Sequence, residues 1–133
     1  RQHDMNIPEG LRYSKDHEWV RFEDGSVRIG ITDYAQHELG DVVFVDLKPA
    51  GTKVGEGDPV GTVESVKAVS DVYSPVSGTV TDVNPDLESS PELVNEDCYG
   101  RGWMVVVQGA SGQELDKLMD AAAYGDYLSK EAK

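Results

Sequence analysis

The middle of the chain, residues 41–83, is rich in β-branched residues and is interrupted at short intervals by glycine and proline. A β-branched and aromatic run at 42–45 ends in a turn at 48–51, and a second break follows at 55–59. Valine then recurs at every third position from 60 to 72, a spacing that matches neither the strand period nor the helix period. Residue type and the bounding turns favour strands. We therefore expect short strands joined by tight turns here, and no long helix.

A β-hairpin followed by a short helix is predicted before this segment. Strand-like runs within residues 19–31 flank Asp24 and Gly25, and glycine accepts the positive φ angle that a tight hairpin turn requires. The side chain of Thr32 can then cap the N-terminus of a helix over residues 33–39.

One strand and two helical segments are predicted nearer the C-terminus. Pro91 suits the first helical position of a single turn at 90–93, and the apolar run at 103–107 predicts a strand that is buried on both faces. A capping box at 111–114 precedes an apolar stripe at helical spacing, which predicts a helix that Gly125 ends and a short helical tail after it. The stripe consists of Leu115, Leu118, Met119 and Ala122.

The composition excludes several classes of function. The 133 residues include 25 acidic and 12 basic side chains, a formal net charge of −13 that would repel nucleic acid and an anionic membrane surface. Cys98 is the single cysteine, so the chain can form no internal disulfide and no cysteine cluster for a metal. No apolar run approaches the roughly 20 residues of a membrane-spanning helix. We expect a protein of a reducing compartment with no nucleic-acid or membrane partner.

The segment around Lys67 carries the most specific motif. The sequence Glu-Ser-Val-Lys-Ala at 64–68, followed by Ser-Pro-Val-Ser-Gly at 74–78, closely resembles the lipoylation site of glycine cleavage H proteins. Biotin carriers usually place methionine on both sides of the lysine, and the lipoyl domains of 2-oxo acid dehydrogenases usually have Asp-Lys-Ala. This chain has Val-Lys-Ala, which favours the H-protein family.

The resemblance extends over residues 9–128. Each further motif is weak alone, but their occurrence together in the family's order is specific. The segments are Tyr13–Val20, Gly30–Gln36, Leu39–Asp41, Pro91–Asn95 and Gly102–Trp103.

The resemblance implies an all-β fold with short peripheral helices, a barrel-sandwich hybrid like other lipoyl and biotinyl carriers, with a C-terminal helix. It also implies covalent lipoate on Lys67 and no catalysis by the chain itself. The cleft that shelters the family's lipoyl arm maps onto Glu18, Glu38 and Asp71, and Glu38, beside His37, stands where some relatives have histidine. The residues expected to mark the attachment site are Glu64, Ser65, Val66 and Ala68.

The partners follow from the same resemblance. A pyridoxal-phosphate glycine decarboxylase would load the aminomethyl group of glycine, and a tetrahydrofolate-dependent aminomethyltransferase would release ammonia and pass the one-carbon unit to folate. A dihydrolipoamide dehydrogenase containing FAD would reoxidise the carrier, and lipoate-attaching enzymes would modify it. We expect a monomer, cytoplasmic if bacterial and in an organelle matrix if eukaryotic.

The residues around Lys67 support this interpretation independently. In the family the lysine lies at the tip of a tight hairpin, yet the sequence has no glycine or asparagine there and places β-branched Val66 beside it. Propensity alone would continue one strand through this point, and broken local rules are expected at functional sites. We therefore expect a strained turn that presents an exposed amine.

Other functions have less support from the sequence. The pair His17 and Glu18 suggests acid–base chemistry, but neighbours on a strand point to opposite faces. Cys98 could be a nucleophile only with a histidine nearby, and a half-buried thiol is the simpler interpretation. An H-like protein that only passes lipoate to other acceptors stays open as an alternative, whereas an enzyme would need a catalytic constellation.

We expect residues 1–8 to be an N-terminal extension and residues 9–133 to be one lipoyl-carrier domain with a C-terminal helical segment. Met5 would then be the native start, and residues 1–4 a non-native remnant.

Overall fold

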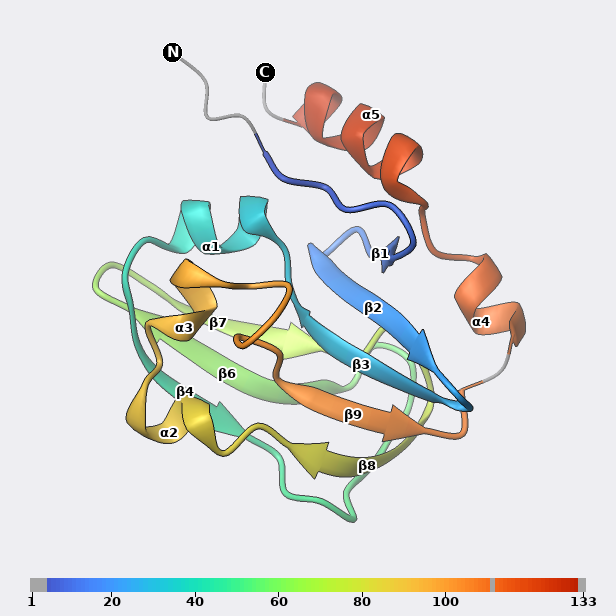
Figure 1. Ribbon diagram of the computed structural model, residues 1–133, viewed down its shortest axis with the longest axis horizontal. Coiled ribbons are helices and arrows are strands. Elements are labelled where there is room, and N and C mark those ends of the chain that lie inside the picture. Colours follow the sequence, from blue (N-terminus) through green and yellow to red (C-terminus); the bar gives the residue numbers. More distant parts are fainter. Residues whose placement is uncertain (1–4, 111, 132–133) are drawn as a thin grey trace.

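The computed structural model describes residues 5–110 and 112–131 of the chain (Figure 1). Its strands are β1 (Arg12–Tyr13), β2 (Glu18–Glu23), β3 (Ser26–Ile31), β4 (Val42–Leu47), β5 (Lys53–Val54), β6 (Pro59–Ser65), β7 (Val69–Tyr73), β8 (Gly78–Val83) and β9 (Val105–Gln108). Its helices are α1 (Asp33–Leu39), α2 (Asp86–Ser89), α3 (Leu93–Glu96), α4 (Gly112–Asp116) and α5 (Ala121–Glu131). Among these residues no helix is long and apolar enough to cross a membrane.

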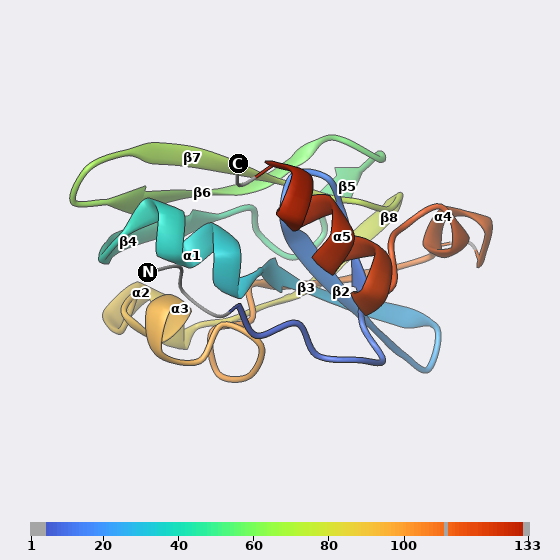
Figure 2. The ribbon, with the colours of Figure 1, turned by 90° about the horizontal axis from the view of Figure 1, so that it is seen from above.

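Two antiparallel sheets form the body of the protein. One sheet has six strands in the order β1-β2-β3-β9-β8-β5, and the other has three in the order β4-β6-β7. Figure 2 shows the second sheet lying over the first, with the short helices at the periphery. The expected all-β barrel-sandwich architecture with short helices and a C-terminal helix is therefore confirmed.

The core lies between the two sheets and is built mainly from valine. Its buried side chains include Val27, Ile29, Val105 and Val107 from one sheet and Val60, Val63 and Val72 from the other. Burying apolar surface is worth about 25 cal/mol per Å², so this layer is the main source of stability.

The predicted hairpin and first helix are confirmed. The turn between β2 and β3 places Asp24 at φ 47° and Gly25 at φ 85°, two positive angles that match the twist of the flanking strands. Thr32 caps α1, because its Oγ1 accepts the N–H of Ala35 at 3.2 Å. Gly40 follows the helix at φ 82°.

The valine spacing that fitted no period has a local explanation. Val60, Val63 and Val72 are buried, whereas Val66 and Val69 are 68% and 66% exposed. The chain reverses between β6 and β7, and the register of the pair shifts near the start of β6, so no single period applies along this segment.

The helical turn predicted at 90–93 is placed too early. Helix α3 begins at Leu93, and Pro91 lies in the preceding turn, where its carbonyl accepts the N–H of Val94. Helix α2 was not predicted at all. The apolar strand predicted at 103–107 is confirmed with shifted bounds: β9 spans Val105–Gln108, and Val105 and Val106, on opposite faces, are both buried.

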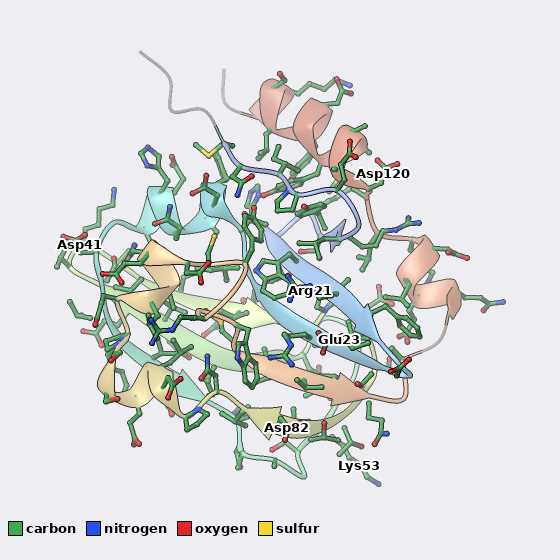
Figure 3. All side chains as sticks on the ribbon, viewed as in Figure 1. Arg21, Glu23, Asp41, Lys53, Asp82 and Asp120 are labelled. Atoms are coloured by element: carbon green, nitrogen blue, oxygen red, sulfur yellow. The ribbon has the colours of Figure 1, made fainter. Side chains whose placement is uncertain are left out.

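The prediction of one helix that runs from the capping box to Gly125, with a short helical tail after it, is wrong. The chain forms α4 and α5 with a break between them, because Met119 pairs with Tyr13 through two backbone hydrogen bonds of 2.8 and 2.9 Å. Asp120, which Figure 3 shows beside the start of α5, then accepts the N–H of Ala123 at 2.8 Å. Gly125 lies inside α5 and does not end it. The predicted capping residue, Ser111, is outside the described residues.

A second apolar cluster joins α5 to the outer face of the six-stranded sheet. Its buried members are Leu11, Tyr13, Trp19, Tyr124 and Leu128. Residues 5–8, which the sequence assigned to an extension, also reach this region: Met5 and Ile7 pack against the cluster, and the Tyr13 hydroxyl donates to the Pro8 carbonyl.

Candidate functional site

Lys67 lies at the tip of the β6–β7 hairpin. Residues 65–68 form the turn, which the N–H of Ser65 closes by donating to the carbonyl of Ala68 at 2.8 Å. The side chains of Glu64, Val66, Lys67 and Ala68 are all exposed. Figures 1 and 2 both show this turn projecting at one end of the molecule, where another protein can reach it.

The turn is not strained in the way that the sequence suggested. Among the described residues other than glycine, positive φ angles occur at His17 and Asp24 only, so neither Val66 nor Lys67 adopts the left-handed conformation. The side chain of Ser65 stabilises the turn: its Oγ accepts the N–H of Lys67 at 3.2 Å and that of Ala68 at 3.1 Å. Ser65 is buried, so its contribution is to shape the turn from within.

A neighbouring loop supports the hairpin tip. The N–H of Val66 donates to the carbonyl of Asp41 at 3.0 Å, and Figure 3 shows Asp41 at the same end of the molecule as the turn. The side chain of Lys67 passes over this loop. If residue 40 had a Cβ atom, that atom would lie 3.5 Å from Cε of Lys67.

Asn95 on α3 holds the loop that contains Gly40 and Asp41 in place. Its Oδ1 accepts the N–H of Val42 at 2.8 Å, and its Nδ2 donates to the Gly40 carbonyl at 2.9 Å and to Oε1 of Gln36 at 3.0 Å. These bonds link α1, α3 and the start of β4 around one amide. The sequence motif at 91–95 gave no indication of this role.

A groove of about 340 Å³ adjoins the hairpin. The segment before β2, the end of β3, helix α1 and the two strands of the hairpin form its walls. The lining residues are Asp16, His17, Glu18, Ile31, Tyr34, Ala35, Glu38, Leu39, Val63, Ala68, Val69, Ser70, Asp71 and Val72. Glu18, Glu38 and Asp71, which come from three separate parts of the sequence, therefore meet in one groove.

Glu18 is the buried carboxylate of this groove. It is only 2% exposed, its Oε1 accepts the Ser14 hydroxyl at 2.6 Å, and its Oε2 accepts the N–H of Tyr73 at 3.1 Å. Burial raises the pKa of Glu18 to about 7, although both hydrogen bonds oppose the rise. A carboxylate held in this way still has lone pairs for a further donor.

The other two predicted carboxylates are more accessible. Glu38 is exposed on α1, and Asp71 is exposed on β7, where its Oδ1 accepts the Thr62 hydroxyl at 3.3 Å. His17 and Tyr34 also line the groove, with their rings 4.7 Å apart. Neither was predicted there from the sequence, although both lie within the family motifs. Only the fold shows that helix α1 faces β7.

The alternative chemistries gain no support. Cys98 is buried, and burial raises the pKa of its thiol to about 12, so it is a poor nucleophile at neutral pH. His17 and Glu18 have different partners, since Nδ1 of His17 lies 2.9 Å from the Tyr124 hydroxyl. Within the described ranges, 5–110 and 112–131, no group of histidine, cysteine and carboxylate side chains could hold a metal ion.

Comparison with known proteins agrees with this geometry. The sequence model of the family described as glycine cleavage H-protein matches residues 11–131. The chain belongs to the glycine cleavage H-protein family. The match includes the hairpin that carries Lys67 and all the residues that line the groove.

Individual members of the H-protein family match over almost their whole length. Glycine cleavage system H protein from Salinibacter ruber is 55% identical over 122 residues, 92% of this chain and 98% of that protein. The protein of the same name from Bacillus velezensis is 50% identical over 127 residues, 96% of this chain and 100% of that protein. The crystal structure of a glycine cleavage system H protein from Mycobacterium marinum has a TM-score of 0.82 at 38% identity, covering 96% of this chain and 100% of that one.

Proposed function

We propose that this chain is the lipoyl-bearing carrier of a glycine cleavage system and that lipoate is joined by an amide to Nζ of Lys67. One observation carries the proposal: an exposed lysine lies at the tip of a hairpin whose strands form a wall of the adjoining groove. Membership of the H-protein family supports the carrier role.

The groove is chemically suited to a flexible apolar arm that ends in a cation. Its described lining includes four carboxylates, no lysine and no arginine, and its other members are mostly aliphatic or aromatic. Ile31, Leu39 and Val63 would contact the apolar part of the arm and exclude water from it. Glu18 and Asp71 could accept charge-assisted hydrogen bonds from an ammonium group at its end.

The residues of the chain bind and orient, and the enzymes of the system carry out the chemistry. When bound, the lipoyl group supplies a disulfide that can take up the aminomethyl group derived from glycine. Lys67 supplies the primary amine for attachment, and forming the amide removes its positive charge. The two paired strands hold the attachment point in place, while a long single-bonded arm beyond it can reach separate active sites.

The proposed partners are glycine decarboxylase with pyridoxal phosphate, aminomethyltransferase with tetrahydrofolate and dihydrolipoamide dehydrogenase with FAD. Lipoate-attaching enzymes must also recognise the β6–β7 turn. A net charge of −13 would accelerate encounters with basic surfaces on any of them. The chain itself is proposed to be a non-catalytic component.

Intact mass measurement of the variant Lys67→Arg tests the attachment site. Arginine keeps the charge and most of the length but cannot form the lipoyl amide, so we expect no adduct after incubation with a lipoate ligase, lipoate and ATP. Lys53→Arg is the control, because Lys53 is an exposed lysine that Figure 3 shows at the far edge of the larger sheet. This variant should gain one adduct, like the parent chain. Stability should change by no more than about 0.5 kcal/mol in either variant.

The same two variants test the carrier role in a reconstituted mixture of the partner enzymes. Glycine cleavage should disappear with Lys67→Arg and persist with Lys53→Arg. Glycine cleavage by the Lys67→Arg chain, or an adduct on another of its lysines, would refute the assignment of Lys67.

A further inference from the structure

The C-terminal helix makes a polar contact with two walls of the groove through one side chain. Tyr124, on α5, is completely buried, and its Oη lies 2.8 Å from Thr32 Oγ1 and 2.9 Å from His17 Nδ1. Thr32 caps α1, the helix that carries Tyr34 and Glu38. His17 immediately precedes Glu18 at the start of β2.

The two contacted residues also bind each other through the backbone. The N–H of Thr32 donates to the carbonyl of His17 at 3.0 Å. His17 has a φ of 68°, a left-handed conformation that residues with a Cβ adopt only when their surroundings hold them there. Tyr124 therefore closes a ring of hydrogen bonds around a backbone conformation that sets the direction of the next residue, Glu18.

Packing fixes the position of the Tyr124 hydroxyl. Its ring stacks on that of Tyr13 with centroids 4.6 Å apart and an angle of 4° between the planes. Burial also raises the pKa of Tyr124, so the hydroxyl stays protonated and can donate one hydrogen bond while accepting another. Because the Tyr124 hydroxyl can either donate to or accept from His17, the arrangement is compatible with both tautomers of the His17 ring.

We propose that Tyr124 is a positioning residue for the groove: its hydroxyl holds the start of β2 and the N-terminus of α1 in the relative position that places Glu18 and Glu38 around a bound arm. This inference rests on the proposed function of the groove. It assigns to α5 a part in the carrier mechanism, although none of the side chains of α5 that the structure describes lines the groove.

The test variant is Tyr124→Phe, which keeps the ring, the stacking on Tyr13 and the burial but removes both hydrogen bonds. Tyr127→Phe is the matched control, because Tyr127 lies on the same helix and its hydroxyl donates to the Lys15 carbonyl at 3.2 Å. Val106→Ala, in β9 and away from the groove, provides a second control that lowers global stability by truncating a buried side chain.

The first measurement is amide hydrogen exchange of the unmodified chain, which needs no lipoate. The net loss of one hydrogen bond favours local opening about fivefold. Exchange of peptides covering 14–20 and 31–39 should therefore accelerate at least about fivefold in Tyr124→Phe. In Tyr127→Phe the peptide covering 31–39 should exchange at the parent rate, because the hydrogen bond to Lys15 lies within 14–20 and not within 31–39. Equal exchange in these peptides for Tyr124→Phe and the parent chain would overturn the proposal.

The second measurement is the lifetime of the aminomethyl-loaded protein, monitored by the release of ammonia. We expect Tyr124→Phe to shorten this lifetime about threefold to tenfold beyond the effect of Val106→Ala at matched melting temperature, with ligase modification of Lys67 unchanged. A shortening no greater than in Val106→Ala would reduce Tyr124 to a purely structural residue and overturn the proposal.

Failure of the proposed function is distinguishable from failure of this inference. If the parent chain protects its load no better than a small lipoamide does, the sheltering function of the groove is wrong. Protection by the parent chain together with equal protection by Tyr124→Phe rejects only the role of Tyr124.

Discussion

The carboxylate of Glu18 on β2 accepts a hydrogen bond from the backbone N–H of Tyr73 on β7, with 3.1 Å between Oε2 and N. The two residues belong to different sheets, so this bond joins the layers at the edge of the groove. A buried carboxylate that holds two layers together couples the stability of the fold to pH.

Stability should therefore depend on pH through Glu18. Its pKa in the folded protein is raised from the ordinary 4.5 to about 7, so between these values the folded state binds more protons than the unfolded state. The free energy of unfolding must then fall as pH rises through this window. Glu18→Gln cannot ionise, and we expect it to be more stable relative to the parent chain at pH 8 than at pH 5, by on the order of 1 kcal/mol or more.

Urea unfolding of both proteins at the two pH values measures this difference. Glu64→Gln, an exposed carboxylate on β6, is the control and should show the same small change in stability at both. A Glu18→Gln effect that does not vary with pH would show that Glu18 titrates normally.

Removal of the Ser65 hydroxyl should loosen the turn that presents Lys67. Ser65→Ala leaves the N–H groups of Lys67 and Ala68 without their shared acceptor, which should lower the free energy of unfolding by about 1–2 kcal/mol. We expect slower ligase modification of Lys67 as well, because the amine is less well positioned. Ser70→Ala, an exposed serine on the same hairpin, should change neither quantity. Rapid modification of Ser65→Ala would mean that the ligase needs no ordered turn.

Asn95→Ala should affect the same hairpin from a greater distance. It removes three hydrogen bonds around the loop that supports Val66, and the expected loss of stability is about 1–3 kcal/mol. Asn84→Ala is a matched control, because Asn84 also makes three side-chain hydrogen bonds, to residues 86, 101 and 103. At equal loss of melting temperature, only Asn95→Ala should slow ligase modification of Lys67, and equal slowing in both would indicate a global effect.

Local signals in the sequence were sufficient for part of this fold. Asp24-Gly25 and Thr32 determine the conformation of backbone groups within a few residues of them, and the structure confirms the hairpin turn and the helix cap. The break between α4 and α5 could not be predicted in this way, because it depends on pairing between Met119 and the distant Tyr13. Helical spacing describes one segment and carries no information about what that segment contacts.

The candidate site likewise has features that the sequence predicted and others that only the fold shows. The motif predicted Lys67 as the attachment site, and family resemblance predicted Glu18, Glu38 and Asp71, which the fold brings to one groove. The unstrained turn was missed because propensity describes the backbone alone, whereas the Ser65 side chain supplies the acceptors. The contacts of Tyr124 link segments far apart in the chain, which no local pattern can show.

The position of the amine at the turn is the sharpest test of how Lys67 is selected. Exchanging the two tip residues, Val66→Lys with Lys67→Val, keeps composition and charge, and both positions are exposed, so the fold should tolerate the exchange. The exchange moves the amine off the position that passes over Gly40. A ligase that recognises the folded hairpin should modify the exchanged chain at least about tenfold more slowly, because a one-residue shift turns a side chain toward a different surface. Adduct formation followed by mass, after circular dichroism has confirmed folding, gives the two rates. Equal rates would show that an accessible lysine is enough and that the geometry of the turn does not select Lys67.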